Sequence, residues 1–94
     1  MTTQLLSPEE LAIQLPAGWH YNNAERAIVK EYNKGNFSGA ISFINKIASF
    51  AEAQDHHPDL FLHKYSKVRV ILSSHSAGGV TGNDLKLAKI IDAI

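Results

Sequence analysis

Residues 39–58, GAISFINKIASFAEAQDHHP, decide how the rest of the chain is interpreted. Their apolar side chains recur every three or four residues, which places them on one wide face of an α-helix. The members of this face are Ala40, Ile41, Phe43, Ile44, Ile47, Ala48, Phe50 and Ala51. We expect the helix to end near Asp55 or His56, because Pro58 forces the residue before it out of the helical region.

A short helix and a hairpin are predicted before this long helix. Ser7 can cap a helix start, Pro8 suits its first position, and Glu10 can complete a capping box. The segment should stop at residues 16–18, Pro-Ala-Gly. Residues 19–21 and 27–32 then indicate two short strands, joined by a turn that begins at Asn22-Asn23.

Two more strands and a third helix are predicted after the long helix. Residues 61–65 are expected to be extended, and residues 67–74 alternate apolar and polar side chains as a half-buried strand does. Residues 76–79 indicate a flexible turn, and Thr81 with Asp84 repeats the capping pattern before a last amphipathic helix. This order predicts an α+β fold, α-β-β-α-β-β-α, with a four-stranded antiparallel sheet and three helices on one face.

Composition limits the class of protein. The chain has 94 residues, so we expect a single domain over residues 1–94. Its formal net charge is zero, which argues against direct nucleic-acid binding, and it has no cysteine for disulfides or thiolate metal sites. The N-terminal segment shows no signal peptide, and no apolar run reaches the roughly 20 residues of a membrane span. We therefore expect a cytoplasmic protein.

The adjacent pair His56-His57 is the first candidate for chemistry. If the long helix runs to His56, Glu52 lies one turn earlier on the same face, and its charge and the helix C-terminus both favour a protonated imidazole there. Such a group can act as a general acid near neutral pH. Pro58 should direct His57 elsewhere. His75 lies between a strand end and a glycine turn, where functional groups are common; its distance from His56 is left open.

Other interpretations of these residues are weaker but open. A metal site could use imidazoles and Asp55, although adjacent histidines rarely converge on one ion. A nucleophilic serine beside His75 is disfavoured, since neighbours on a strand face opposite ways. His20 and His63 are expected to be structural or solvated. Taken alone, Glu52 suits a helix-face charge and Asp84 suits a helix cap.

The combined pattern is more specific than its parts. Glu52, His56-His57-Pro58, Tyr65, His75 and Asp84, with their spacing, resemble the signature of the pterin-4a-carbinolamine dehydratases. The likeness includes Gly18-Trp19, residues 27–30, 65–68 and 78–81, and extends over residues 6–94. One departure is Ser74, which stands where the family commonly has threonine and keeps the hydroxyl.

The resemblance implies a function and a set of roles. Members of the family dehydrate 4a-hydroxytetrahydropterin to quinonoid dihydropterin in tetrahydrobiopterin recycling, by histidine acid–base catalysis and without a metal or cofactor. By this resemblance His56 and His75 transfer protons, His57 orients the pterin, and Glu52 sustains the histidines, with Asp84 in support. The polar edge of the pterin would be lined by Asp55, Ser73, Ser74 and Ser76. Which histidine is the acid is left open.

The resemblance also implies partners. Family members form homodimers, some of which pair into homotetramers, and an aromatic amino acid hydroxylase is a candidate partner. An alternative role is non-enzymatic, as a dimerisation or stabilising partner of a hydroxylase or a transcription factor. Because the chain keeps His56, His57 and His75, catalysis is favoured.

Overall fold

The structure is a computed structural model that describes residues 4–94. Residues 1–3 lie outside the described part. They belong to the domain expected over residues 1–94 and to the N-terminal segment in which no signal peptide was expected. The elements are α1 (Pro8–Gln14), β1 (His20–Asn22), β2 (Ala27–Asn33), α2 (Phe37–Gln54), β3 (Asp59–His63), β4 (Lys67–Leu72), the 3-10 turn η1 (His75–Ala77) and α3 (Gly82–Asp92). The predicted α+β class and element order are confirmed.

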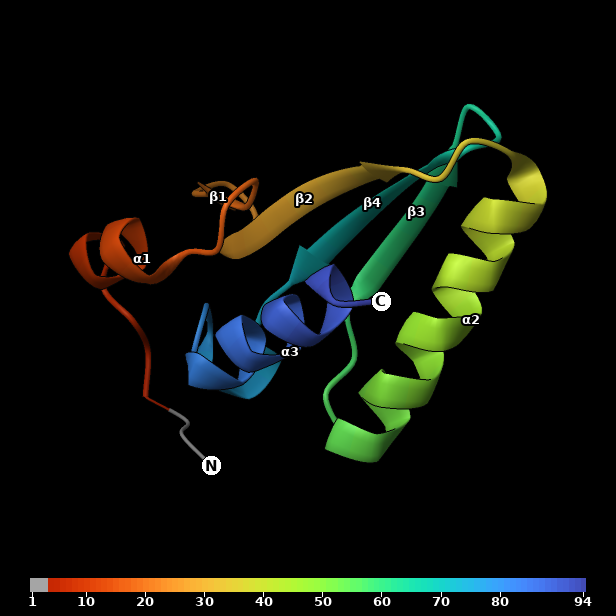
Figure 1. The fold of residues 1–94 in the computed structure, drawn as a ribbon. Coiled ribbons are helices and arrows are strands. Elements are labelled where there is room, and N and C mark those ends of the chain that lie inside the picture. Colours follow the sequence, from red (N-terminus) through yellow and green to blue (C-terminus); the bar gives the residue numbers. More distant parts are fainter. Residues whose placement is uncertain (1–3) are drawn as a thin grey trace.

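The four strands form one antiparallel sheet in the order β1-β2-β4-β3. β2 and β4 are the central strands, with a register that runs from Ile28 opposite Leu72 to Asn33 opposite Lys67. β1 and β3 are the edges. This arrangement brings the end of β4 close to the start of β3 and so to the segment that follows α2 (Figure 1).

The helices pack on one face of the sheet, as predicted. Alternate side chains of β4, at Val68, Val70 and Leu72, are completely buried, and their neighbours along the strand are only partly buried. The buried side chains form one cluster with side chains from all three helices, including Leu11 of α1 and Ile47 of α2. Figure 1 shows α2 and α3 on the same side of the strands.

The predicted helix starts are confirmed. The Ser7 hydroxyl accepts from the Glu10 amide, and the Glu10 carboxylate accepts from the Ser7 amide, which completes the capping box of α1. Thr81 and Asp84 form the same box at α3. No helix within residues 4–94 is both long enough and apolar enough to cross a membrane.

The end of α2 differs from the expectation in one respect that affects the site. The helix ends at Gln54, and Asp55 takes a left-handed conformation with φ 50°. The His56 amide still donates to the Ala51 carbonyl at 3.1 Å, which closes the helix end. His56 therefore follows the helix and is not on its last turn.

The bounds of β3 and β4 were predicted wrongly. β3 covers Asp59–His63 and not residues 61–65, because Lys64 and Tyr65 both have positive φ (49° and 57°) and form the turn to β4. β4 ends at Leu72, two residues earlier than expected.

The segment predicted as a flexible turn after β4 has a defined conformation. Gly78, whose φ is 78°, caps the C-terminal end of η1, and the Ser74 amide donates to the Gly79 carbonyl at 2.7 Å. These hydrogen bonds close the turn onto the end of β4. They fix the backbone on either side of His75.

Candidate active site

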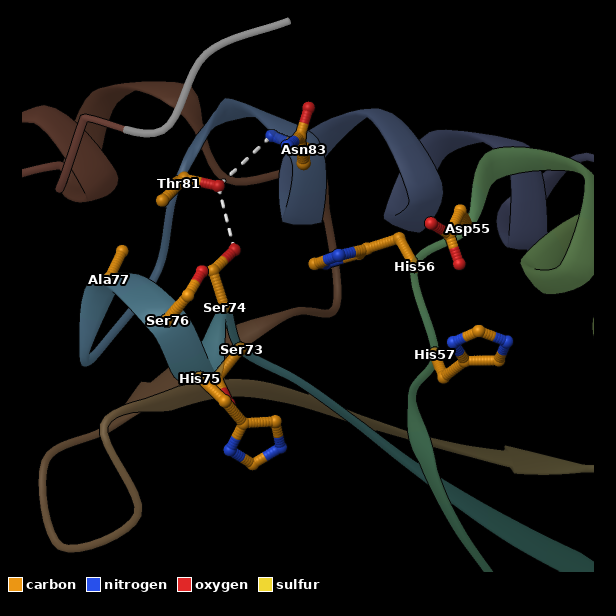
Figure 2. A pocket seen from close by; sticks show the side chains of 10 residues that line it. All are labelled: Asp55, His56, His57, Ser73, Ser74, His75, Ser76, Ala77, Thr81 and Asn83. Carbon is orange, nitrogen blue, oxygen red and sulfur yellow. Dashed lines mark hydrogen bonds between the residues drawn. The ribbon is translucent and has the colours of Figure 1, made fainter.

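A cavity of about 400 Å³ lies where the segment after α2, the end of β4 with η1, and the start of α3 meet (Figure 2). Ten residues line it: Asp55, His56, His57, Ser73, Ser74, His75, Ser76, Ala77, Thr81 and Asn83. All seven residues that the sequence suggested for pterin contact are among them. Ala77, Thr81 and Asn83 were not expected there. The capping pattern identified Thr81 as a helix start, but such a pattern does not show which surface that start faces.

His56 is held by a carboxylate that the sequence did not suggest for it. Its Nε2 lies 2.5 Å from Oδ1 of Asp84, at the start of α3. The His56 side chain is 16% exposed and that of Asp84 is 0% exposed. The expected pairing of His56 with Glu52 is wrong, because the left-handed turn at Asp55 carries His56 away from the helix face that bears Glu52.

Glu52 contacts His57. The distance from Glu52 Oε1 to His57 Nε2 is 3.0 Å. The two side chains are 77% and 55% exposed, so water screens this pair and its contribution to stability is small. Glu52 does not line the cavity. The rings of His56 and His57 point in different directions, as predicted, although both residues line the same cavity (Figure 2).

His75 reaches the cavity from the other side. It is the first residue of η1, three residues after the end of the central strand β4, and it is exposed. All three histidines line the cavity, and Figure 2 shows His75 on the η1 side and the other two on the segment after α2, with the His56 ring extending toward Ser74 and the His57 ring pointing away from it. The structure thus brings together three histidines that the sequence separates by up to 19 positions (75 − 56).

The Asp84 carboxylate is the centre of a buried polar network. Its Oδ2 accepts from the Ser74 hydroxyl at 3.0 Å and from the Thr81 amide at 2.9 Å. The Ser74 and Thr81 hydroxyl oxygens are 2.8 Å apart and hydrogen-bonded. Asp84 is therefore the predicted cap of α3 and also a direct partner of His56. A buried charge with several hydrogen bonds is held in one place, since losing any of them would leave it unsatisfied.

The remaining candidates lie elsewhere or lack the required partners. His63 contacts Glu31 at 2.6 Å and stacks on Phe61, and His20 belongs to β1; neither lines the cavity. Within residues 4–94, no three or more acidic or histidine side chains are grouped so that they could hold a metal ion. No serine hydroxyl in that range is hydrogen-bonded to the His75 ring, and the Ser74 hydroxyl is bonded to Asp84 and Thr81.

This arrangement suits proton transfer to a small ligand. The cavity volume lies in the range of about 300–1,000 Å³ that is usual for small-molecule sites. Imidazole can donate or accept a proton near neutral pH. One of the three rings has a buried carboxylate partner, one has an exposed carboxylate partner, and His75 has no carboxylate partner among residues 4–94. The three imidazoles therefore differ in the carboxylates that lie beside them.

Comparison with known proteins places the chain among related sequences. The family model for pterin 4 alpha carbinolamine dehydratase matches residues 4–94. The chain is 42% identical over 87 residues to "Putative pterin-4-alpha-carbinolamine dehydratase 2" of Gloeobacter violaceus. The aligned region covers 88% of this chain and 94% of that protein. It is 45% identical over 91 residues to the "Putative pterin-4-alpha-carbinolamine dehydratase" of Aquifex aeolicus, with coverage of 95% and 89%.

Two solved structures share the fold. The crystal structure of a transcriptional coactivator/pterin dehydratase from Brucella melitensis has a TM-score of 0.88 and 34% identity, covering 96% of this chain and 97% of that one. A pterin dehydratase-like protein, identified as a RuBisCO assembly factor in the alpha-carboxysome, has a TM-score of 0.67 over 81% of this chain and 87% of that one. Its identity is 18%, so this second likeness concerns the fold alone.

Proposed function

The chain belongs to the pterin-4a-carbinolamine dehydratase family, and we propose on that basis that it is a hydro-lyase that removes water from 4a-hydroxytetrahydropterin. The product would be quinonoid dihydropterin, and the reaction would serve tetrahydrobiopterin recycling. The observation that carries the proposal is the meeting of His56, His57 and His75 around one cavity of suitable size.

The proposed reaction moves two protons. A proton delivered to the 4a-hydroxyl allows the C4a–O bond to break and water to leave. A proton lost from N5 frees the electron pair that forms the N5=C4a double bond. His56 and His75 would carry out these transfers. General acid–base catalysis of this kind typically contributes about 10²–10⁴ in rate, and imidazole can supply it without a metal or a cofactor.

The other site residues would bind and orient the substrate. His57 would hold the pterin ring, with Glu52 fixing the His57 ring through their 3.0 Å contact. Asp55, Ser73 and Ser76 line the cavity and would meet the polar edge of the pterin. Ser74 also lines it, but its hydroxyl already serves Asp84.

The test is to generate the carbinolamine in situ with an aromatic amino acid hydroxylase and to follow its decay with and without the protein. We expect the protein to accelerate the decay. His56→Ala and His75→Ala should each lower that acceleration by about 10²-fold or more. His63→Ala is the matched control, since His63 lies outside the cavity. An unchanged decay rate in the presence of the native protein would contradict the proposal.

A non-enzymatic role is the second candidate. It is favoured by the likeness to a protein described as a transcriptional coactivator/pterin dehydratase. In this role the chain would promote dimerisation of a transcription factor or stabilise a hydroxylase by contact. The double change His56→Ala with His75→Ala separates the two functions, because a contact role tolerates it and a catalytic role does not.

We further propose that the chain acts as a homodimer or homotetramer in the cytoplasm, without binding nucleic acid directly. The balanced charge supports the last point. Self-association is supported by the position of β3 at an edge of the sheet that residues 4–94 form, since an edge strand can pair with a second sheet. Next to this edge, Phe61 is 56% exposed.

A further inference from the structure

The hydrogen bonds around Asp84 carry information about where protons reside. The carboxylate is 0% exposed, and both of its oxygens have partners in the protein. The Thr81 amide can only donate, so Oδ2 accepts from it. The Ser74 hydroxyl donates to the same oxygen. Having used its only proton there, the Ser74 hydroxyl accepts from the Thr81 hydroxyl.

The remaining contact, between Oδ1 of Asp84 and Nε2 of His56, is then also fixed in direction. An ionised carboxylate is only an acceptor, so the proton of this hydrogen bond belongs to His56 Nε2. A neutral imidazole has one ring proton. In neutral His56 that proton is on Nε2, and Nδ1 carries a free lone pair.

Nδ1 of His56 is available to a ligand. No hydrogen-bond partner for it exists within residues 4–94, and no buried side-chain nitrogen or oxygen in that range lacks a partner. Nδ1 is therefore not buried, and His56 is one of the residues that line the cavity. His75, in contrast, has no carboxylate partner in the described part of the chain.

We propose that Asp84, held in place by Ser74 and Thr81, is a positioning residue that makes Nδ1 of His56 the base of the reaction. This assignment rests on the proposed dehydratase function and deepens it. Nδ1 takes the N5 proton, the N5 electron pair forms the N5=C4a bond, and the C4a–O bond breaks as His75 protonates the departing hydroxyl. Both histidines then return to their starting states by exchange with water.

The charge distribution supports this division of roles. The Asp84 carboxylate lies against Nε2, so it faces the positive charge that forms when Nδ1 of His56 accepts a proton. No such carboxylate lies against His75 within residues 4–94. The base is thus the histidine with a buried anion behind it, and the acid is the histidine without one.

The first test is independent of catalysis. ¹⁵N NMR of histidine-labelled protein reports which ring nitrogen is protonated in neutral His56. We expect the Nε2–H form in the native protein. In Asp84→Asn an amide hydrogen can donate to Nε2, so we expect the Nδ1–H form instead. An Nδ1–H tautomer in the native protein would overturn the proposal. The expected tautomer in a protein without dehydratase activity would refute the catalytic function but support the Asp84–His56 arrangement.

The second test is kinetic. Asp84→Asn should lower kcat by about 10²-fold or more with little change in KM, because the pterin still binds but meets the wrong tautomer. Ser74→Ala should lower kcat by about 5–20-fold, and Ser74→Thr should restore it because threonine keeps the hydroxyl donor. Asp92→Asn is the matched control on the same helix, outside the cavity, and should leave kcat unchanged. If Asp84→Asn does not fold, the proposal is tested by the tautomer of His56 in the native protein and by the kcat values of Ser74→Ala and Ser74→Thr. Equal kcat in Ser74→Ala and the native protein would contradict the proposal.

Discussion

Gly78 positions His75 through its backbone. Its φ is 78°, which side-chain-bearing residues adopt at a cost of about 1–2 kcal/mol, and an added Cβ would meet no atom within 4 Å. Its amide donates to the carbonyls of Ser74 and His75 and so closes η1. We expect Gly78→Ala to lower the free energy of unfolding by about 1 kcal/mol and to reduce dehydratase activity, because a strained turn no longer holds His75 in place. Urea denaturation and the carbinolamine assay measure the two effects.

Gly35 provides the matched control for this prediction. Its φ is 85°, an added Cβ there also meets nothing within 4 Å, and the residue lies in the loop between β2 and α2, outside the cavity. Gly35→Ala should cost the same stability and leave activity unchanged. Equal losses of activity in the two variants would mean that the effect of Gly78→Ala comes from stability alone.

The sequence predicts which histidines gather but not how each is held. The pattern of the family identifies His56, His57 and His75, and all three line the cavity. The predicted partner of His56 was wrong because α2 ends at Gln54 and the left-handed conformation of Asp55 turns the chain off the helical path before His56. Its actual partner, Asp84, is 28 residues away. The packing of α3 beside α2 in the common core brings the two together.

At the scale of the elements, Asp92 ties the end of α3 to β2 and to the segment before β1. Its carboxylate accepts from Trp19 Nε1 at 3.1 Å, from Lys30 Nζ at 2.8 Å and from the Tyr32 hydroxyl at 2.5 Å. Burial alone would raise the pKa of Asp92, but these hydrogen bonds and the charge of Lys30 outweigh it and lower that pKa. Burial, with the hydrogen bond and charge of Asp92, raises the pKa of Tyr32.

This tie predicts an acid-sensitive component of stability. A carboxyl whose pKa is lower in the folded chain stabilises the fold in its ionised form, so its contribution is present above about pH 4 and is lost as pH falls further. We expect Asp92→Asn to cost about 1 kcal/mol at pH 7, since the group is partly exposed, and to cost less at pH 3. Urea denaturation at both pH values tests this. If Asp92→Asn lowers the free energy of unfolding by the same amount at pH 7 and pH 3, the charge of Asp92 contributes nothing to stability.

Element boundaries were predictable where the local pattern is strong. The alternation in β4 and the capping boxes of α1 and α3 place these elements within two residues of their observed positions. β3 was misplaced by two residues because its turn uses Lys64 and Tyr65 in left-handed conformations. Neither residue type favours that region, so tertiary pairing of β3 with β4 determines the turn and the local sequence does not.

At the scale of the whole molecule, the topology explains why the site forms at one end of the sheet. α2 leads into β3 and β4 leads into η1 and α3, and β3 is paired with β4 from Asp59 opposite Ile71. The start of β3 and the end of β4 are therefore neighbours. The residues just before the one and just after the other are His56-His57 and Ser73–Ser76, which is why they line a common cavity. Because β3 and β4 are antiparallel neighbours, the segment before β3 and the segment after β4 must lie at the same end of the sheet.

Among residues 4–94, the same topology leaves β3 as an edge strand that is paired with β4 on one side and unpaired on the other. Protein chains commonly protect such edges by charge, by short length or by pairing with another copy. β1 is the shorter edge, with three residues against five in β3. Next to the β3 edge, Phe61 exposes 56% of its surface while stacked on His63. These features favour β3 over β1 as the contact between copies.

Analytical ultracentrifugation should find the native protein at twice or four times the mass of one chain. Phe61→Lys adds a charge to β3, and because charges on an edge strand oppose sheet-to-sheet pairing we expect it to shift the protein toward monomer by at least tenfold in dissociation constant. Ile13→Lys is the matched control: Ile13 is 85% exposed on α1, outside β3, and its replacement should leave the mass unchanged. A native monomer, or a Phe61→Lys variant that associates as strongly as the native protein, would exclude β3 as the interface.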